Sequence, residues 1–199
     1  MSGRNAKVSA YDRDTHNFYV EPAWAVRALL EVERRFDRPV MDPCAGSGTV
    51  PRTLRGAGMD AYGCDLIDRD LGNPLLSTGC LRETIRTWRP RNIVSNPPYD
   101  RWEEVVEIGF DAGADRICLL LPIRYVEGIE RAKWYRIFTP ARKWNFSQRV
   151  DMPPHGKPVV AQDGKKKRGN KQYAWFVWER GWTESHYQGG WLPIMDTAP

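Results

Sequence analysis

The segment Asp42-Pro43-Cys44-Ala45-Gly46-Ser47-Gly48 contains a pair of glycines that would allow a ligand to approach the backbone closely. Pro51 stands where a dinucleotide-binding loop would carry its third glycine, and no Gly-Lys-Ser/Thr follows. The segment therefore matches neither the dinucleotide fingerprint nor the phosphate-binding P-loop. Because it opens with a carboxylate, it suits a ligand that carries a positive charge better than one that carries a phosphate.

A second acidic residue, Asp65, follows about 20 residues after Asp42, a spacing suited to hydrogen bonds with ribose hydroxyls. Taken singly, Asp42 could cap a helix and Asp65 could belong to a turn. Together, framing a Gly-x-Gly turn, they favour a nucleoside cofactor. S-adenosylmethionine fits this chemistry, since it carries a sulfonium and an ammonium and has no phosphate. We expect Asp42 to accept from that ammonium, directly or through water, and Asp65 and Leu66 to contact the cofactor as well.

The segment Asn96-Pro97-Pro98-Tyr99 offers two hydrogen-bond acceptors and a flat ring in a stiff turn. An amino group on an aromatic base is a weak nucleophile because its lone pair is delocalised. Acceptors at the Asn96 side chain and the Pro97 carbonyl would localise that lone pair and stabilise the developing positive charge. The alternative is a proline-rich turn without function. We predict methyl transfer to an exocyclic amino nitrogen, with Tyr99 stacked on a base flipped out of a duplex.

Strands and helices alternate along the chain. Apolar periodicity and turn residues predict helices at 22–36, 49–55, 81–88, 102–112 and 125–138, and strands at 38–41, 60–64, 92–95, 116–121, 143–150 and 172–178. This order is typical of an α/β fold of the Rossmann-like class, a mostly parallel twisted sheet with helices on both faces. Three of the predicted strands lead into the polar segments described above, so we expect those segments to share one crevice at the carboxyl ends of the strands.

The combination of DPCAGSG with NPPY resembles the S-adenosylmethionine-dependent amino-methyltransferases, in particular small phage-type DNA adenine-N6 methyltransferases, from about Phe18 to Trp182. The resemblance implies a class I methyltransferase that acts on N6 of adenine in DNA. It also implies that further residues hold the cofactor: Phe18, Tyr19, Glu21, Pro22 and Asn96. Glu21 stands where many members have Thr, and near residues 76–80 there is no acidic residue to contact the cofactor's adenine, so that contact is left unassigned.

Basic residues are concentrated in one loop of a chain whose net charge is +5. We predict that the loop at about 151–171 contacts the phosphates of a nucleic acid, with a solvated loop as an equal alternative. The residues assigned to the substrate, besides Tyr99, are Arg149, Lys165, Lys166, Lys167 and Arg168. Since no long insertion provides a target-recognition domain, sequence specificity is left to this loop or to partners, or is weak.

Other functions remain open at this stage. An RNA adenine-N6 methyltransferase and a protein-glutamine N-methyltransferase would need the same site chemistry. Cytosine N4 is a further option, although Ser is more usual there in place of Asn96. A non-catalytic nucleic-acid-binding module of the same fold is the alternative from another class, and cofactor titration would distinguish it.

Residues 1–17 are expected to be a flexible segment and 18–199 a single methyltransferase domain. No apolar stretch is long enough to span a membrane and no apolar signal region is present, so a cytoplasmic location is expected. The cysteines and histidines fit no metal pattern, and we expect no metal and free, buried thiols. Trp182 and Trp191 are expected to cover the sheet. The oligomeric state is left open.

Overall fold

The computed structural model describes residues 19–33, 35–36, 38–67, 75–153, 156–157, 160, 164, 169 and 171–196. They form a sheet with the strand order β3-β2-β1-β4-β5-β7-β6-β8. The strands are β1 (Val40–Asp42), β2 (Ala61–Asp65), β3 (Leu76–Thr78), β4 (Asn92–Ser95), β5 (Arg116–Pro122), β6 (Arg142–Asn145), β7 (Tyr173–Glu179) and β8 (Gln188–Trp191). The helices are α1 (Ala23–Val32), α2 (Thr49–Gly56), α3 (Leu81–Trp88), α4 (Trp102–Ala112), the 3-10 helix η1 (Ile123–Val126) and α5 (Ile129–Tyr135).

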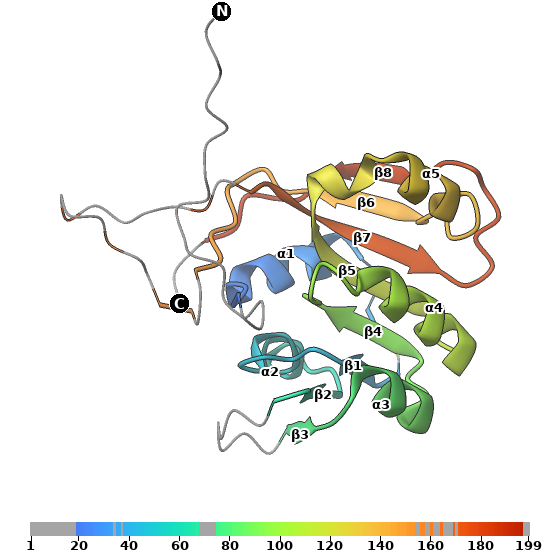
Figure 1. Ribbon diagram of the computed structural model, residues 1–199. Coiled ribbons are helices and arrows are strands. Elements are labelled where there is room, and N and C mark those ends of the chain that lie inside the picture. Colours follow the sequence, from blue (N-terminus) through green and yellow to red (C-terminus); the bar gives the residue numbers. More distant parts are fainter. Residues whose placement is uncertain are drawn as a thin grey trace, which may run out of the picture.

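The sheet is parallel except at β7. Strands β3, β2, β1, β4 and β5 pair in parallel, β7 runs antiparallel to both β5 and β6, and β8 pairs in parallel with β6. The prediction of a Rossmann-like, mostly parallel sheet is therefore confirmed. Because β6 and β8 have the same direction as β5, their carboxyl ends share the edge at which β1, β2 and β4 end (Figure 1).

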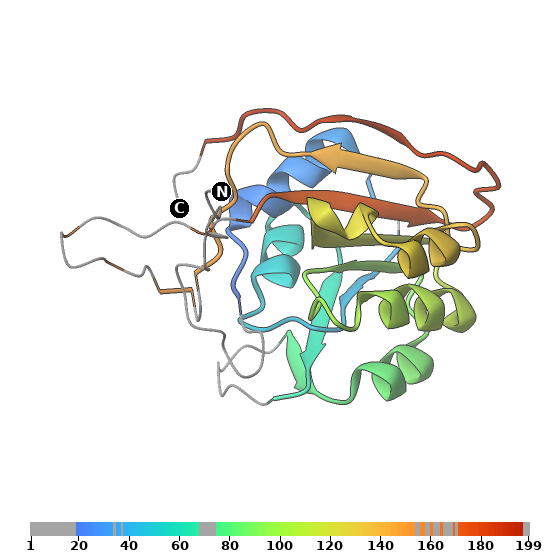
Figure 2. The same cartoon turned by 45° about the horizontal axis from the view of Figure 1, so that its top comes forward.

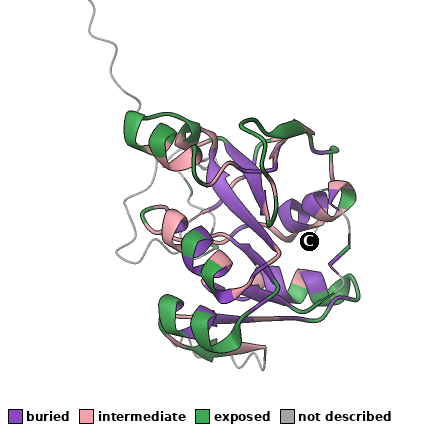
Figure 3. Ribbon diagram, turned by 90° about the vertical axis from the view of Figure 1, so that its right-hand side faces the viewer, coloured by how far each residue is buried: buried purple, intermediate pink, exposed green. Residues whose placement is uncertain are grey.

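Helices cover both faces of the sheet, as expected (Figure 2). One apolar cluster joins α1 and α2 to the sheet, and the other joins α3 and α4 to the opposite face. Strand β7 shows why the sequence folds this way: Trp175 and Val177 belong to the first cluster, and Phe176 and Trp178 belong to the second. The strand is apolar from Tyr173 to Trp178, and only its last residue, Glu179, is charged, which suits burial on both sides. The buried strands lie between helices whose outer turns are exposed (Figure 3).

Several element boundaries differ from the prediction. The helix expected over 125–138 divides into η1 and α5 at Gly128, whose φ of 122° breaks the helix. The strand expected over 143–150 ends at Asn145, and the helix expected over 22–36 ends at Val32. Strands β3 and β8 were missed because they are short and lack an apolar pattern.

Within the described ranges, no helix has the length and apolar character needed to cross a membrane. The same part of the chain holds no group of His, Cys, Asp and Glu side chains arranged for a metal ion. The cysteines are free thiols, and Cys64 and Cys118 are buried as expected, whereas Cys80 is exposed. Cys80 differs because it lies between the edge strand β3 and α3, at the border of the sheet.

Candidate active site

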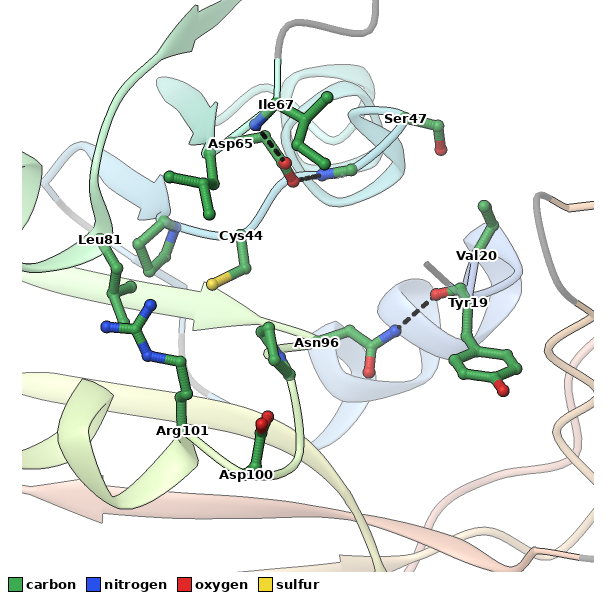
Figure 4. Close-up of a pocket in the computed structure, with 14 residues that line it drawn as sticks. Tyr19, Val20, Cys44, Ser47, Asp65, Ile67, Leu81, Asn96, Asp100 and Arg101 are labelled. Atoms are coloured by element: carbon green, nitrogen blue, oxygen red, sulfur yellow. Dashed lines mark hydrogen bonds between the residues drawn. The ribbon is translucent and has the colours of Figure 1, made fainter. Parts of the chain in front are cut away.

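Three strand ends converge on one pocket at the carboxyl edge of the sheet (Figure 4). Gly46 follows β1, Asp65 ends β2 and Asn96 follows β4, as the alternation of elements led us to expect. The residues that line the pocket are Tyr19, Val20, Pro43, Cys44, Gly46, Ser47, Asp65, Leu66, Ile67, Leu81, Asn96, Pro98, Asp100 and Arg101.

The glycine loop is held directly against β2. Gly46 and Gly48 have φ values of 51° and 78°, in the left-handed region that favours glycine. The Gly46 amide donates to the Oδ2 atom of Asp65 at 2.8 Å. At Gly63 an added Cβ would lie 2.6 Å from the Cβ of Ala45, so only glycine at that position of β2 permits this approach. Gly48 and Ala45 shape the turn and do not line the pocket.

Asp42 is buried beneath the glycine loop, where it is hydrogen-bonded to Cys44 and Ser95, and it does not line the pocket. It is 2% exposed, and its Oδ1 atom accepts from the hydroxyl of Ser95 at 2.6 Å and from the amide of Cys44 at 3.1 Å. Burial raises the pKa of this carboxyl well above its usual value. A direct contact with a ligand's ammonium, which we expected from the sequence, would require this network to open. In the structure Asp42 joins the ends of β1 and β4.

Asp65 lies in the pocket wall next to apolar residues. Its Oδ1 atom accepts from the amide of Ile67 at 3.1 Å, and Leu66, Ile67 and Leu81 continue the wall. Sequence reasoning included Leu66 and missed Ile67 and Leu81. Leu81 is the first residue of α3, which follows β3, a strand that the sequence did not predict. Because β3 pairs with β2, α3 starts beside the pocket.

Asp100 and Arg101 were also missed, although they follow the Asn-Pro-Pro-Tyr turn directly. Arg101 is the basic residue in the pocket lining, and its Nε atom donates to Glu104 at 2.8 Å. A cation that is already paired is a weak partner for a phosphate, which agrees with the chemistry expected of the glycine loop.

The amide of Asn96 is fixed at both ends. Its Nδ2 atom donates to the carbonyl oxygen of Tyr19 and to Oε2 of Glu21, both at 3.0 Å, and its Oδ1 atom accepts from the Tyr99 hydroxyl at 3.2 Å. The two acceptors on one side determine which end of the amide carries the nitrogen, and the Tyr99 hydroxyl can then donate to the oxygen. The side-chain oxygen is thereby directed toward Tyr99.

Glu21 therefore supports Asn96 and does not line the pocket. Its side chain is 7% exposed, and burial raises its pKa to about 7, although the hydrogen bond from Asn96 acts in the opposite direction. We expected Glu21 to help hold a cofactor's ammonium, but its side chain does not reach the pocket lining. Pro22, the next residue, is the N-cap of α1, whereas Tyr19, two positions before Glu21, does line the pocket.

Tyr99 packs in a group of aromatic rings and contacts a cation. Its ring centroid lies 6.0 Å from that of Tyr125 and 6.2 Å from that of Tyr173. The Nζ atom of Lys171 lies 5.2 Å from the Tyr99 centroid and 5.4 Å from that of Tyr19. Burial raises the pKa of Tyr99 well above its usual value, so its hydroxyl stays protonated and can donate to Asn96.

The remaining predicted residues lie elsewhere or are outside the described part of the chain. Phe18 and the basic residues Lys165, Lys166, Lys167 and Arg168 lie outside the described residues, as does the N-terminal segment 1–17. Arg149 is exposed, and its Nη1 atom donates to the carbonyl of Gly169 at 2.6 Å. It lines a second groove at the same edge of the sheet, and not the pocket.

Comparison with known proteins gives structural similarity alone. No protein-family profile matches the chain, and no curated protein sequence matches it. A solved S-adenosylmethionine-dependent methyltransferase from Archaeoglobus fulgidus has a TM-score of 0.53 at 12% identity, over 79% of this chain and 92% of that one. The fold is that of the Rossmann-like methyltransferases.

Two similar structures come from restriction-modification systems. The modification subunit of a putative type I restriction enzyme from Vibrio vulnificus has a TM-score of 0.54 at 12% identity, over 89% of this chain and 48% of that one. The methyltransferase subunit of a type I restriction-modification system from Streptococcus thermophilus has a TM-score of 0.51 at 12% identity, over 92% and 47%. The chain spans about half the length of these two subunits, and at this identity the likeness concerns the fold alone.

Proposed function

We propose that this chain is an S-adenosylmethionine-dependent methyltransferase that methylates N6 of adenine in DNA. The observation that carries the proposal is the convergence of Gly46, Asp65 and Asn96 on one pocket, with the Asn96 amide fixed by its neighbours. The methyltransferase fold supports the reaction class. The two restriction-modification subunits, which have the same fold, make DNA the substrate to test first.

The pocket's chemistry suits a nucleoside without phosphates. Asp65 and Ser47 provide polar partners for a sugar and an ammonium, and Leu66, Ile67 and Leu81 provide an apolar wall for an adenine ring. The lining contains no lysine among the described residues, and Arg101 is engaged by Glu104. S-adenosylmethionine bound here would supply an electrophilic methyl group on its sulfonium.

The turn that contains Asn96 would bind the amine that accepts the methyl group. Its Oδ1 atom and the carbonyl of Pro97 would accept the two N–H bonds of the target amine, and Tyr99 would stack on the base. The Tyr99 hydroxyl now donates to Oδ1, which has a second lone pair for the amine. Glu21 and the Tyr19 carbonyl keep Nδ2 turned away, so the amide presents an acceptor, and not a donor, to the substrate.

A labelling experiment tests the substrate. The protein is incubated with radiolabelled cofactor and, separately, with duplex DNA, single-stranded DNA, RNA and a protein lysate, and the products are digested to nucleosides or amino acids. We expect the label in N6-methyladenine from DNA. Label in RNA, in cytosine or in glutamine would assign a different substrate, and no transfer to any of them would contradict the proposal.

Replacing Asn96 tests the catalytic assignment. We expect Asn96→Ala to lower the turnover number by at least about a hundredfold, since it removes one fixed acceptor from the transition state. Cofactor affinity, measured by calorimetry, should change little and serves as the control for folding. Undiminished transfer by the variant would refute the role given to Asn96.

A further inference from the structure

A second groove lies beside Tyr99 at the same edge of the sheet. It has a volume of about 420 Å³ and is formed where β6 and β8 end and β7 begins. We call it the Trp191 groove and define it by Phe146, Arg149, Lys171, Gln172, Tyr173 and Trp191. None of its charged or aromatic side chains has a part in the proposed methyl transfer.

The groove is connected to the active site by direct contacts. Lys171 and Tyr173 line it, and both contact Tyr99: the ammonium of Lys171 at 5.2 Å from the ring centroid and the ring of Tyr173 at 6.2 Å between centroids. The Tyr99 hydroxyl in turn donates to Asn96, which lines the first pocket. The Trp191 groove therefore adjoins Tyr99, the residue proposed to stack on the target base.

The groove's charge is complementary to a phosphodiester. Its lining includes two cations, Arg149 and Lys171, and the lining residues in the described part of the chain include no aspartate or glutamate. Arg149 and Gln172 are exposed, so both can reach a ligand in the groove. A groove lined by positive side chains together with aromatic rings is typical of surfaces that bind single-stranded nucleic acid.

Trp191 provides an exposed aromatic platform on a rigid support. Its side chain is 72% exposed, whereas the adjoining Leu192 is 1% exposed and its amide donates to the carbonyl of Asn145 at 2.8 Å. Trp191 is the last residue of β8 and pairs in register with Asn145 of β6. The sequence-based expectation that Trp191 covers the sheet is therefore wrong, because β8 adds an edge strand that turns the indole outward.

We propose that the Trp191 groove binds the single-stranded nucleotide next to the target base, with the indole stacked on its base and Arg149 and Lys171 against its phosphates. The inference rests on the proposed function, since it assumes that Tyr99 receives the target. A rigid exposed indole in a groove that is also lined by two cations suits base stacking, which tolerates any base and so adds affinity without demanding a sequence.

The first test separates binding from methylation. Binding of a fluorescently labelled single-stranded oligonucleotide is measured by anisotropy as a function of salt for the wild type, Arg149→Gln, Lys171→Gln and the control Arg86→Gln on α3. We expect each groove variant to lower the slope of log affinity against log salt by about one, and the control to leave it unchanged. No binding by the wild type, or equal slopes in all variants, would overturn the inference.

The second test concerns the stacking residue. We expect Trp191→Ala to weaken oligonucleotide binding, and to raise the KM for DNA, by about 5- to 150-fold, since stacking contributes roughly 1–3 kcal/mol per base. Trp191→Phe should retain most of the affinity, and cofactor affinity should not change. Trp88→Ala is the control, because Trp88 is 39% exposed and packs on Tyr62 at the other end of the sheet.

Photocrosslinking locates the contact. An oligonucleotide with 5-iodouracil next to the target adenine should crosslink to the peptide that contains Trp191, as identified by mass spectrometry. Binding and crosslinking without any methyl transfer would contradict the proposed function alone. Methyl transfer to DNA by a Trp191→Ala variant with unchanged KM, and no crosslink in the wild type, would contradict the groove assignment alone.

Discussion

At the scale of single residues, the pairing of Glu21 with Asn96 gives the candidate site its orientation. A carboxyl group that is 7% exposed accepts from the amide nitrogen of Asn96, which leaves the amide oxygen as the acceptor that the proposed reaction needs. Burial raises the pKa of Glu21 to about 7. This arrangement has a cost in stability, because the folded protein keeps Glu21 protonated at pH values at which the unfolded chain would release the proton.

That cost predicts a pH dependence of stability. Between pH 4.5 and pH 7 the unfolded chain has released the Glu21 proton and the folded protein retains it, so the free energy of unfolding falls as the pH rises. The difference between the ordinary value of 4.5 and about 7 corresponds to roughly 3 kcal/mol. From about pH 4.5 to about pH 8, wild type should lose about that much more stability than Glu21→Gln in urea denaturation.

The glutamine variant is a close control because it keeps an oxygen that can accept from Asn96 Nδ2. The other carboxyl groups are present in both proteins. The charge of Glu21 contributes to the raised pKa of Asp42, so the comparison measures Glu21 together with its effect on Asp42. Parallel pH profiles for the two proteins would show that Glu21 ionises normally in the folded state.

At the scale of elements, a buried ionic network joins α1 to strands β5 and β6. Glu33 accepts from Arg142 Nε at 2.7 Å, from Arg116 Nη1 at 3.2 Å and from Trp144 Nε1 at 2.7 Å. Burial alone would raise the pKa of Glu33, but the hydrogen bonds from Arg142 and Trp144 outweigh it, and the pKa is lowered. The network explains why α1 ends at Val32 and not at Phe36: Glu33 has extended backbone angles that direct its side chain to the sheet.

Neutralising Glu33 should destabilise the fold strongly. We expect Glu33→Gln to lower the free energy of unfolding by about 3–5 kcal/mol, because it removes the negative charge beside Arg116, whose side chain is 3% exposed. Glu130→Gln is the matched control: its partner Lys133 and Glu130 itself are 65% and 82% exposed, so the cost should be about 0–1 kcal/mol. Equal costs in the two variants would argue against a structural role for the network.

At the scale of the whole molecule, ligand binding at the strand ends should stabilise the entire sheet. The pocket joins β1, β2 and β4 with the start of α3, so a bound ligand would favour the folded state as a unit. A ligand at about a hundred times its Kd adds about 2.7 kcal/mol. For a chain of 199 residues this raises Tm by roughly 5–10 °C.

A thermal-shift experiment with matched ligands tests this expectation. S-adenosylmethionine and S-adenosylhomocysteine should raise Tm, whereas ATP at the same concentration should not, because Arg101, the basic residue of the pocket lining, is already paired with Glu104. A larger shift with ATP than with S-adenosylmethionine would contradict the assigned cofactor chemistry.

Local signals in the sequence were sufficient to predict the central part of the fold and to bring three polar segments to one pocket. Apolar runs and the turns between them placed α3, α4 and β4 at their observed bounds, and each of β1, β2 and β4 led into a polar segment. Strand direction then required these segments to meet at one edge, which is why the sequence alone was enough to assign Gly46, Asp65 and Asn96 to one crevice. The turns and the apolar periodicity of the sequence therefore determined the central strands and helices and the edge at which the three polar segments meet.

The tertiary structure alone decided which side chains support the site and which face solvent. Glu21 contacts Asn96 across 75 positions in the sequence, and Asp42 contacts Ser95 across 53, so no local periodicity could reveal either contact. Likewise, the exposure of Trp191 depends on the pairing of β8 with β6, in which Trp191 lies opposite Asn145. Such contacts arise only when the whole sheet has assembled, since each depends on the register of strands that are far apart in the sequence.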